Sequence, residues 1–146
     1  MTPDVNVLVA ASRSDHAHHP QAIGWLKPAL AACRDGASLE ILPMVASGFL
    51  RLVTHPKVFA QPTPTDKALA FLDALLAQPG VEMPTLGREW TTLRQLCRDA
   101  NLSGNDIPDA WIAAAVRTLG SHLVTFDRGF AKLLGRGELT LLRVSA

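Results

Sequence analysis

The segment "NDIPDAWIAAAV" (105–116) places two aspartates three residues apart at the start of an alanine-rich run. On a helical wheel Asp109 lies on the stripe of Ile112 and Val116, so we expect this acid on the face that packs inward. Asp106 has the residue type and position of a helix N-cap, which explains it without any ligand. A cap explains an inward-facing carboxylate less well, so for Asp109 we favour a metal-ligand role.

Two further acids stand beside apolar runs. Asp4 precedes "VNVLVAAS", which fits either a strand or a helix, and Asp127 ends "HLVTFD", a run typical of a buried parallel strand. In open α/β sheets, ligands bind beyond the carboxyl ends of the strands. We therefore expect Asp4, Asp109 and Asp127 to lie close together at that edge of the sheet.

Carboxylates gathered without lysine or arginine between them repel one another, which raises at least one pKa unless a hard cation neutralises them. Oxygen ligands of this kind suit Mg²⁺ or Mn²⁺, and such ions keep several waters and accept phosphate oxygens in the remaining positions. The chemistry best suited to the cluster is metal-assisted hydrolysis of a phosphodiester, in which the cation lowers the pKa of the attacking water.

The elements that must position these acids are helices that alternate with short apolar strands. Apolar residues recur at helical spacing in 20–34, 44–53 and 88–99, from about Thr63 to Pro79, and from "DIPDAW" to about Leu119. The runs "SLEILP", "VEMPTL", "HLVTFD" and "LTLLRV" are strand candidates. The pattern predicts an α/β sandwich with a mostly parallel central sheet of about five strands, flanked by helices.

Composition limits the remaining possibilities. The 146 residues fit one domain, 1–146, that can bury a core without a disulfide or metal staple, and Cys33 and Cys97 are expected as reduced thiols. No apolar stretch approaches the length of a membrane span and the start does not resemble a secretory signal, so we expect a cytoplasmic protein. A net charge of +1 excludes a strongly basic nucleic-acid coat but not a local basic patch.

Four segments together resemble the PIN-domain ribonucleases, and specifically the VapC-type toxins of type II toxin–antitoxin systems. They are "DVNVLVAA", "GFLRLVTHPKVF", "GNDIPDAWIAAA" and "LVTFDRGF", and their order and spacing extend through nearly the whole chain. The resemblance implies a three-layer sandwich, a Mg²⁺-dependent (or Mn²⁺-dependent) endoribonuclease, RNA as substrate, a VapB-type antitoxin as partner, and a homodimer.

The resemblance also assigns roles to individual residues. It makes Asp4, Asp109 and Asp127 the catalytic metal ligands, and it makes Asn6 and Thr125 the groups that orient them. A glutamate that the family carries two residues before "LR" falls on Gly48 in this chain, and Gly129 stands where many relatives have another aspartate. Beside its capping interpretation, Asp106 is therefore a second candidate ligand that would supply the lost charge.

Basic and histidine-containing segments allow two interpretations each. Arg13, Arg51 and Arg128 adjoin the predicted acidic centre and are predicted to contact the RNA backbone, the alternative being a solvated surface. The histidines of "DHAHH" have no second ligand segment with paired spacing, so loop polarity is favoured over a zinc site.

Two other functions compete with the ribonuclease. With Gly48 in place of the glutamate, a catalytically weakened domain would keep only RNA or antitoxin binding. A phosphoacceptor regulatory domain also gathers acids around magnesium, but it needs a lysine at a late strand end, and the terminal strand candidate carries only Arg143.

Overall fold

The computed structural model of the chain describes residues 1–144, so Ser145 and Ala146 of the predicted domain lie outside the described residues. None of the helices within that range is long and apolar enough to cross a membrane. The helices are α1 (Val5–Ser12), α2 (His19–Arg34), α3 (Pro43–Val53), α4 (Thr65–Leu76), α5 (Trp90–Asp99), α6 (Asp106–Thr118) and the 3-10 helix η1 (Arg128–Lys132).

The strands are short and parallel. They are β1 (Thr2–Pro3), β2 (Leu39–Glu40), β3 (Val81–Glu82), β4 (Leu123–Thr125) and β5 (Leu139–Leu141). A mixed α/β fold with a parallel sheet is confirmed, but a single sheet of about five strands is wrong: within residues 1–144 one sheet has the order β1-β4-β5 and another joins β2 to β3. The two sheets meet through hydrogen bonds from Glu40 N to Met1 O (2.8 Å) and from the Met1 ammonium to Ser38 O (2.9 Å), because strands of two residues leave no length for a continuous ladder.

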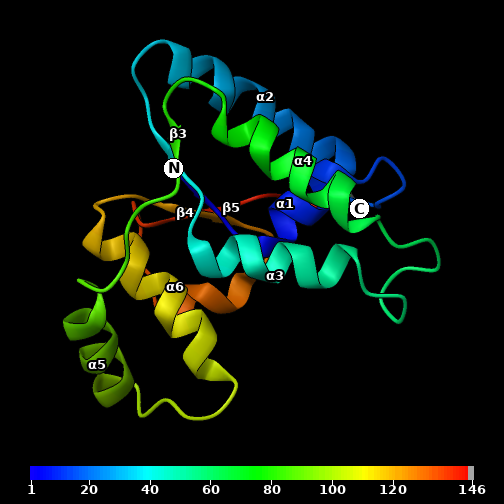
Figure 1. Cartoon of the computed structure of the whole chain (residues 1–146). Coiled ribbons are helices and arrows are strands. Elements are labelled where there is room, and N and C mark those ends of the chain that lie inside the picture. The colour runs from blue at the N-terminus through cyan, green and yellow to red at the C-terminus, as the bar shows by residue number, and fades with distance from the viewer. Residues whose placement is uncertain (145–146) are drawn as a thin grey trace.

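Helices cover both sides of the strands. In Figure 1, β4 and β5 run through the middle of the molecule, with α2 and α4 above them in this view and α5 and α6 below. Helix α1 packs against both α2 and α3, and α5 packs on α6. The carboxyl end of β4 therefore opens between α1 on one side and the start of α6 on the other, which is the edge where the acids were expected.

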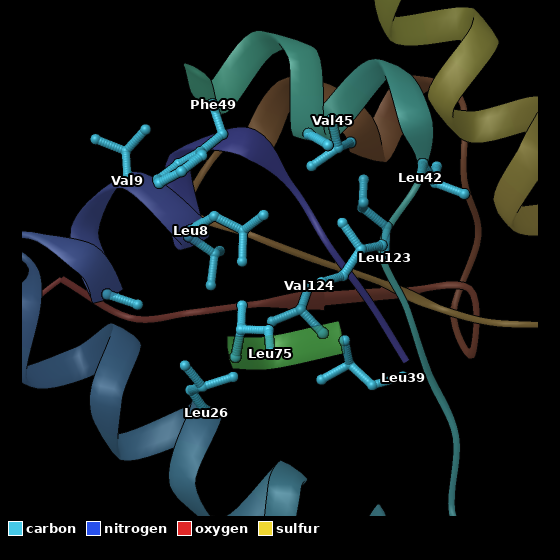
Figure 2. Close-up of a cluster of buried hydrophobic side chains, with 14 of the residues drawn as sticks. Leu8, Val9, Leu26, Leu39, Leu42, Val45, Phe49, Leu75, Leu123 and Val124 are labelled. Atoms are coloured by element: carbon cyan, nitrogen blue, oxygen red, sulfur yellow. The ribbon is translucent and has the colours of Figure 1, made fainter. Parts of the chain in front are cut away.

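The segment "VNVLVAAS", which fitted a strand or a helix, forms α1. Asp4 caps it by accepting a hydrogen bond from Val5 N, and the five consecutive residues Val7–Ala11 are buried. A helix that is apolar on nearly every face is stable only inside a core, and here Leu8 and Val9 pack beside Phe49 of α3 and Val124 of β4 (Figure 2). This packing outweighs the strand preference of the β-branched valines.

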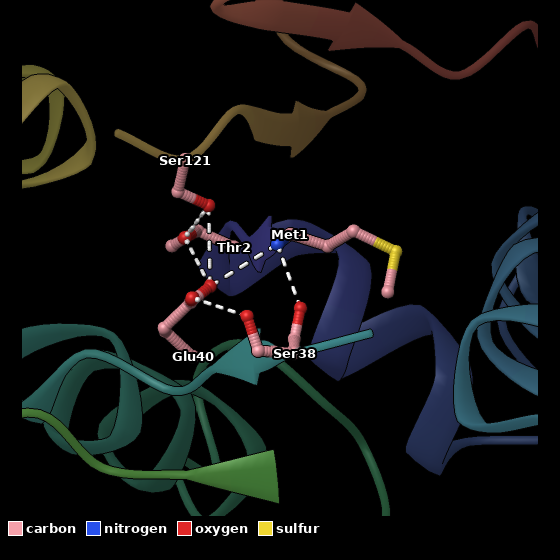
Figure 3. A network of polar contacts seen from close by, with 5 residues as sticks. All are labelled: Met1, Thr2, Ser38, Glu40 and Ser121. Atoms are coloured by element: carbon pink, nitrogen blue, oxygen red, sulfur yellow. Dashed lines mark hydrogen bonds and ion pairs between the residues drawn. The ribbon is translucent and has the colours of Figure 1, made fainter. Parts of the chain in front are cut away.

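A buried carboxylate joins the two sheets at the amino end of β1. Glu40 accepts hydrogen bonds from the Met1 ammonium (3.1 Å), Ser38 Oγ (3.1 Å) and Ser121 Oγ (3.1 Å), and Thr2 Oγ1 donates at 3.3 Å (Figure 3). Burial alone would raise the pKa of Glu40, but these donors outweigh it and hold the pKa below its usual range. Glu40 is thus a structural acid at the end of β2, and its partners lie at the amino ends of β1 and β4.

We expect Glu40→Gln to lower the free energy of unfolding at pH 7 by about 2 kcal/mol, because it removes a charge that accepts several hydrogen bonds. A lowered folded-state pKa stabilises the protein above the unfolded pKa of about 4.3, and this contribution is lost as the pH falls through the folded value. Urea unfolding of both proteins from pH 7 down to about pH 3 should show the difference shrinking. Glu82→Gln, on the paired strand, is the exposed control; a difference that does not change with pH would contradict this role.

Candidate active site

Asp4 stands at the junction between β1 and α1, and only 6% of it is exposed. Its Oδ1 accepts a hydrogen bond from Val5 N (2.7 Å), and its Oδ2 accepts one from the Thr125 hydroxyl (2.7 Å). The first bond is the local consequence of an aspartate before a helix, whereas the second joins residues 121 positions apart. The Asp4 carboxylate is therefore held in one orientation.

Thr125 is the centre of this arrangement. Besides donating to Asp4, its Oγ1 accepts hydrogen bonds from Asn6 Nδ2 (3.1 Å) and from the backbone N of Asp127 (3.0 Å). A hydroxyl has one donor and two acceptor positions, so Thr125 uses its full capacity. Asn6 Oδ1 in turn accepts from Phe126 N (3.3 Å). Thr125 thus contacts the Asp4 carboxylate and the Asp127 backbone directly, whereas Asn6 is connected to them through Thr125.

Asp127 follows β4 and is exposed. Its Oδ1 accepts a hydrogen bond from Gly129 N (2.8 Å), which caps the 3-10 helix η1. A Cβ added at Gly129 would lie 3.0 Å from this same oxygen. The glycine therefore lets the backbone approach Asp127 closely without a side chain crowding the carboxylate.

The acids of α6 are arranged differently from the expectation. The helix begins at Asp106 itself and its N-cap is Asn105, whose side chain makes no capping bond, so the capping interpretation of Asp106 is wrong. Asp109 is exposed, although Ile112 and Val116 on its stripe are buried. The first turn of α6 extends beyond the packed core, so that position 109 borders a cavity rather than the sheet.

The carboxylates are close enough to influence one another. Burial, above all, raises the pKa of Asp4, and the charges of Asp109 and Asp127 raise it further against the lowering effect of the Thr125 bond. Burial also raises the pKa of Asp109, as do the nearby charges of Asp127 and Asp106. Among residues 1–144 no lysine or arginine forms an ion pair with any of these acids. The site is an uncompensated negative cluster.

The chemistry of this cluster limits the cations that it could hold. Its donors are carboxylate oxygens, which suit Mg²⁺ or Mn²⁺ and not zinc. Within the described part of the chain, however, no three His, Cys, Asp or Glu side chains are grouped tightly enough to hold a metal ion by themselves. A cation bound here would have to keep several of its waters, as Mg²⁺ does when one or two carboxylates hold it directly.

A cavity of about 540 Å³ opens beside the acids, a feature that the sequence patterns did not reveal. Asp4, Asn6 and Asp109 form one end of it, and Gly48 lies in its wall. A Cβ added at Gly48 would lie 3.0 Å from Cγ2 of Val5. The rest of the lining is Met44, Arg51, Leu52, Leu93, Ile107, Pro108, Trp111 and Ile112.

Of the arginines predicted to contact RNA, Arg13 is buried and forms its hydrogen bonds within the protein. It is 8% exposed, and its guanidinium donates to the Asp15 carboxylate, to Thr63 Oγ1 (3.0 Å) and to Gln61 O (2.9 Å). It also lies 3.9 Å from the centre of the Phe59 ring. These contacts fasten the loop after α3 to the end of α1.

Arg51 and Arg128 are placed where the prediction needs them. Arg51 lines the cavity beside Gly48, and Arg128 directly follows Asp127. Both are exposed, and neither side chain has an ion-pair or hydrogen-bond partner within residues 1–144. They therefore flank the acidic cluster as two available positive charges.

The chain is similar in sequence to known proteins. The PIN domain family model matches residues 1–134. Ribonuclease VapC43 of Mycobacterium tuberculosis is 39% identical over 130 residues, covering 88% of this chain and 86% of that protein, and ribonuclease VapC31 of the same species is 40% identical over 133 residues, covering 88% and 89%.

The fold is also found in a solved structure. VapBC2 from Rickettsia felis, bound to a DNA fragment from its promoter, matches with a TM-score of 0.66 over 97% of this chain and 98% of that chain. At 16% identity this match shows the fold alone. Together with the sequence relatives, it means that the chain belongs to the PIN domain family and, within it, to the VapC ribonucleases.

Proposed function

We propose that the protein is a Mg²⁺-dependent endoribonuclease toxin that a cognate VapB-type antitoxin restrains, and that it works as a homodimer in the cytoplasm. The observation that carries the proposal is the cluster of Asp4, Asp109 and Asp127, which no cation of residues 1–144 compensates. Relatives named ribonucleases support the nuclease activity, and a solved relative named VapBC supports the antitoxin partner.

In this proposal the acidic residues hold the metal ion, and the arginines bind the RNA. Asp4, Asp109 and Asp127 would hold the cation, which supplies charge stabilisation at the scissile phosphate and lowers the pKa of water. Thr125 fixes Asp4, the most buried of these acids, so that the oxygen positions are set before substrate binds. Arg51 and Arg128, on either side of the acids, would attract the RNA backbone and offset the repulsion between carboxylates and phosphates.

We expect Asp109→Asn to lower RNA cleavage by about a hundredfold or more, because the amide cannot replace the lost negative charge at a metal site. The measurement is cleavage of total cellular RNA by purified protein with Mg²⁺ or Mn²⁺, compared with the same reaction in chelator. Cleavage by the unaltered protein should require the metal.

Asp73→Asn, on the outer face of α4, is a matched control because it changes an exposed aspartate outside the cluster. Equal cleavage by the Asp109→Asn variant and the unaltered protein would assign the activity to a contaminant and refute the proposed role of Asp109.

Thr125→Val should lower cleavage about tenfold to a hundredfold, because Asp4 would lose the bond that orients it. Thr125→Ser keeps a hydroxyl at the same position and should retain most of the activity. The rates of the two variants, measured alongside their melting temperatures, separate orientation of Asp4 from general loss of packing. If serine and valine reduce cleavage equally while both proteins stay folded, the hydroxyl has no positioning role.

The weakened-domain alternative is favoured by one observation. Gly48 leaves the cavity wall without a carboxylate, and Val5 occupies the space into which a side chain at position 48 would grow. We therefore expect the unaltered protein to need a high metal concentration, because its ligand set is one acid short of the family pattern.

Gly48→Glu combined with Val5→Ala, which makes room for the new side chain, should lower the metal concentration at half-maximal cleavage several-fold. A metal titration of cleavage measures this. Ser47→Glu, on the exposed face of α3, adds the same charge outside the cavity and is the control. An unchanged requirement in the double variant would show that position 48 does not serve the metal site.

A further inference from the structure

A second groove, separate from the Gly48 cavity, is lined by the residues directly before and after Asp127. It has a volume of about 650 Å³ and shares no lining residue with that cavity. The groove lies beyond the carboxyl ends of β4 and β5, and β5 is the edge strand of its sheet in the described chain. Its lining consists of Phe126, Arg128, Leu141, Leu142, Arg143 and Val144.

One aromatic ring, that of Phe126, lines this groove. Phe126, the residue before Asp127, is half-buried, and its ring centre lies 5.1 Å from that of His18, with 33° between the planes. The His18 ring is in turn 5.5 Å from the ring of His16. The loop between α1 and α2 therefore supports Phe126 from one side, while Phe126 also faces the groove. A ring held in this way loses little conformational freedom when a flat ligand packs on it.

Positive charge is the second feature of the groove. Arg128 and Arg143 are both exposed, and within residues 1–144 neither side chain is engaged in an ion pair or a hydrogen bond. The remaining lining is apolar, and Leu141 (39%) and Val144 (51%) are among the exposed large hydrophobic residues. The groove thus combines two available guanidinium groups with an aromatic and apolar floor.

Single-stranded RNA has the complementary chemistry. Its phosphates pair with arginines, and its unpaired bases stack on aromatic rings and on guanidinium planes. A duplex does not fit this description, because its bases are already stacked on one another. An acidic peptide would satisfy the arginines but gives no reason for a supported ring beside Asp127.

We propose that the groove of Phe126, Arg128 and Arg143 is a subsite for single-stranded RNA, which stacks an unpaired base on Phe126 and pairs the flanking phosphates with the two arginines. The inference rests on the proposed nuclease function and extends it, because a strand that enters the groove passes Asp127 at the junction with the acidic cluster. Phe126 and Arg143 act here in substrate binding and not in the chemical step.

The test measures binding without cleavage. Fluorescence anisotropy of a labelled single-stranded oligoadenylate is recorded in chelator with the Asp109→Asn protein, and a gel confirms that the RNA stays intact. Phe126→Leu, which keeps apolar volume but removes the ring, should weaken binding about tenfold, whereas Phe126→Trp should retain it. Arg143→Gln should weaken binding and reduce the slope of log affinity against log salt by about 0.7.

Controls and alternatives complete the design. Arg34→Gln, an exposed arginine at the end of α2, should change neither the affinity beyond a small screening effect nor the response to Phe126→Leu. Annealing the probe to oligouridylate should abolish the dependence on Phe126. Equal binding by Phe126→Leu and the parent protein overturns the inference, as does loss of antitoxin binding with RNA binding unchanged, which would make the groove a protein-docking surface.

The binding experiment can refute the RNA subsite without refuting the nuclease activity, and the cleavage experiment can do the reverse. Binding that depends on Phe126 in a protein that never cleaves RNA supports the subsite and refutes the nuclease. Metal-dependent cleavage with binding insensitive to Phe126 and Arg143 refutes the subsite alone.

Discussion

The hydrogen bond from the Thr125 hydroxyl to the Asp4 carboxylate is the interaction on which the site depends. Burial disfavours the charged form of Asp4, and two neighbouring carboxylates disfavour it further, so its pKa is raised despite two good donors. The same hydroxyl accepts hydrogen bonds from the Asn6 side-chain amide and from the Asp127 backbone N. One side chain thereby connects the end of β1, the first turn of α1 and the end of β4.

Parallel pairing explains why these groups meet. Pro3 is in register with Val124, so Asp4, which follows β1, and Thr125, the last residue of β4, lie side by side at the same edge. The Asp4 backbone N extends this ladder by donating to Val124 O (2.9 Å). Asp109 belongs to neither strand. It lies in the first turn of α6, whose buried alanines pack against the core. The cluster is consequently rigid on the sheet side and more exposed on the helix side.

Negative and positive side chains lie near one another at this edge. Arg51 lines the cavity that Asp4 and Asp109 also line, Arg128 directly follows Asp127, and neither arginine has an ion-pair partner among the described residues. A polyanion would be repelled by the acids and attracted by these arginines. The apolar wall around Gly48 strengthens these effects, because charges beside low-dielectric surface are poorly screened.

The amino-acid sequence by itself determined the local features: the parallel α/β pattern, the helix extents within a few residues, and the acids at the ends of β1 and β4. Periodicity and strand-end position are properties of neighbouring residues and can be read directly. Only the tertiary structure decided the division into two small sheets, the burial of Arg13, the position of Asp106 inside its helix, the cavity at Gly48 and the ring pair of His18 and Phe126. These depend on contacts between residues far apart in the chain, whose distances no local spacing specifies.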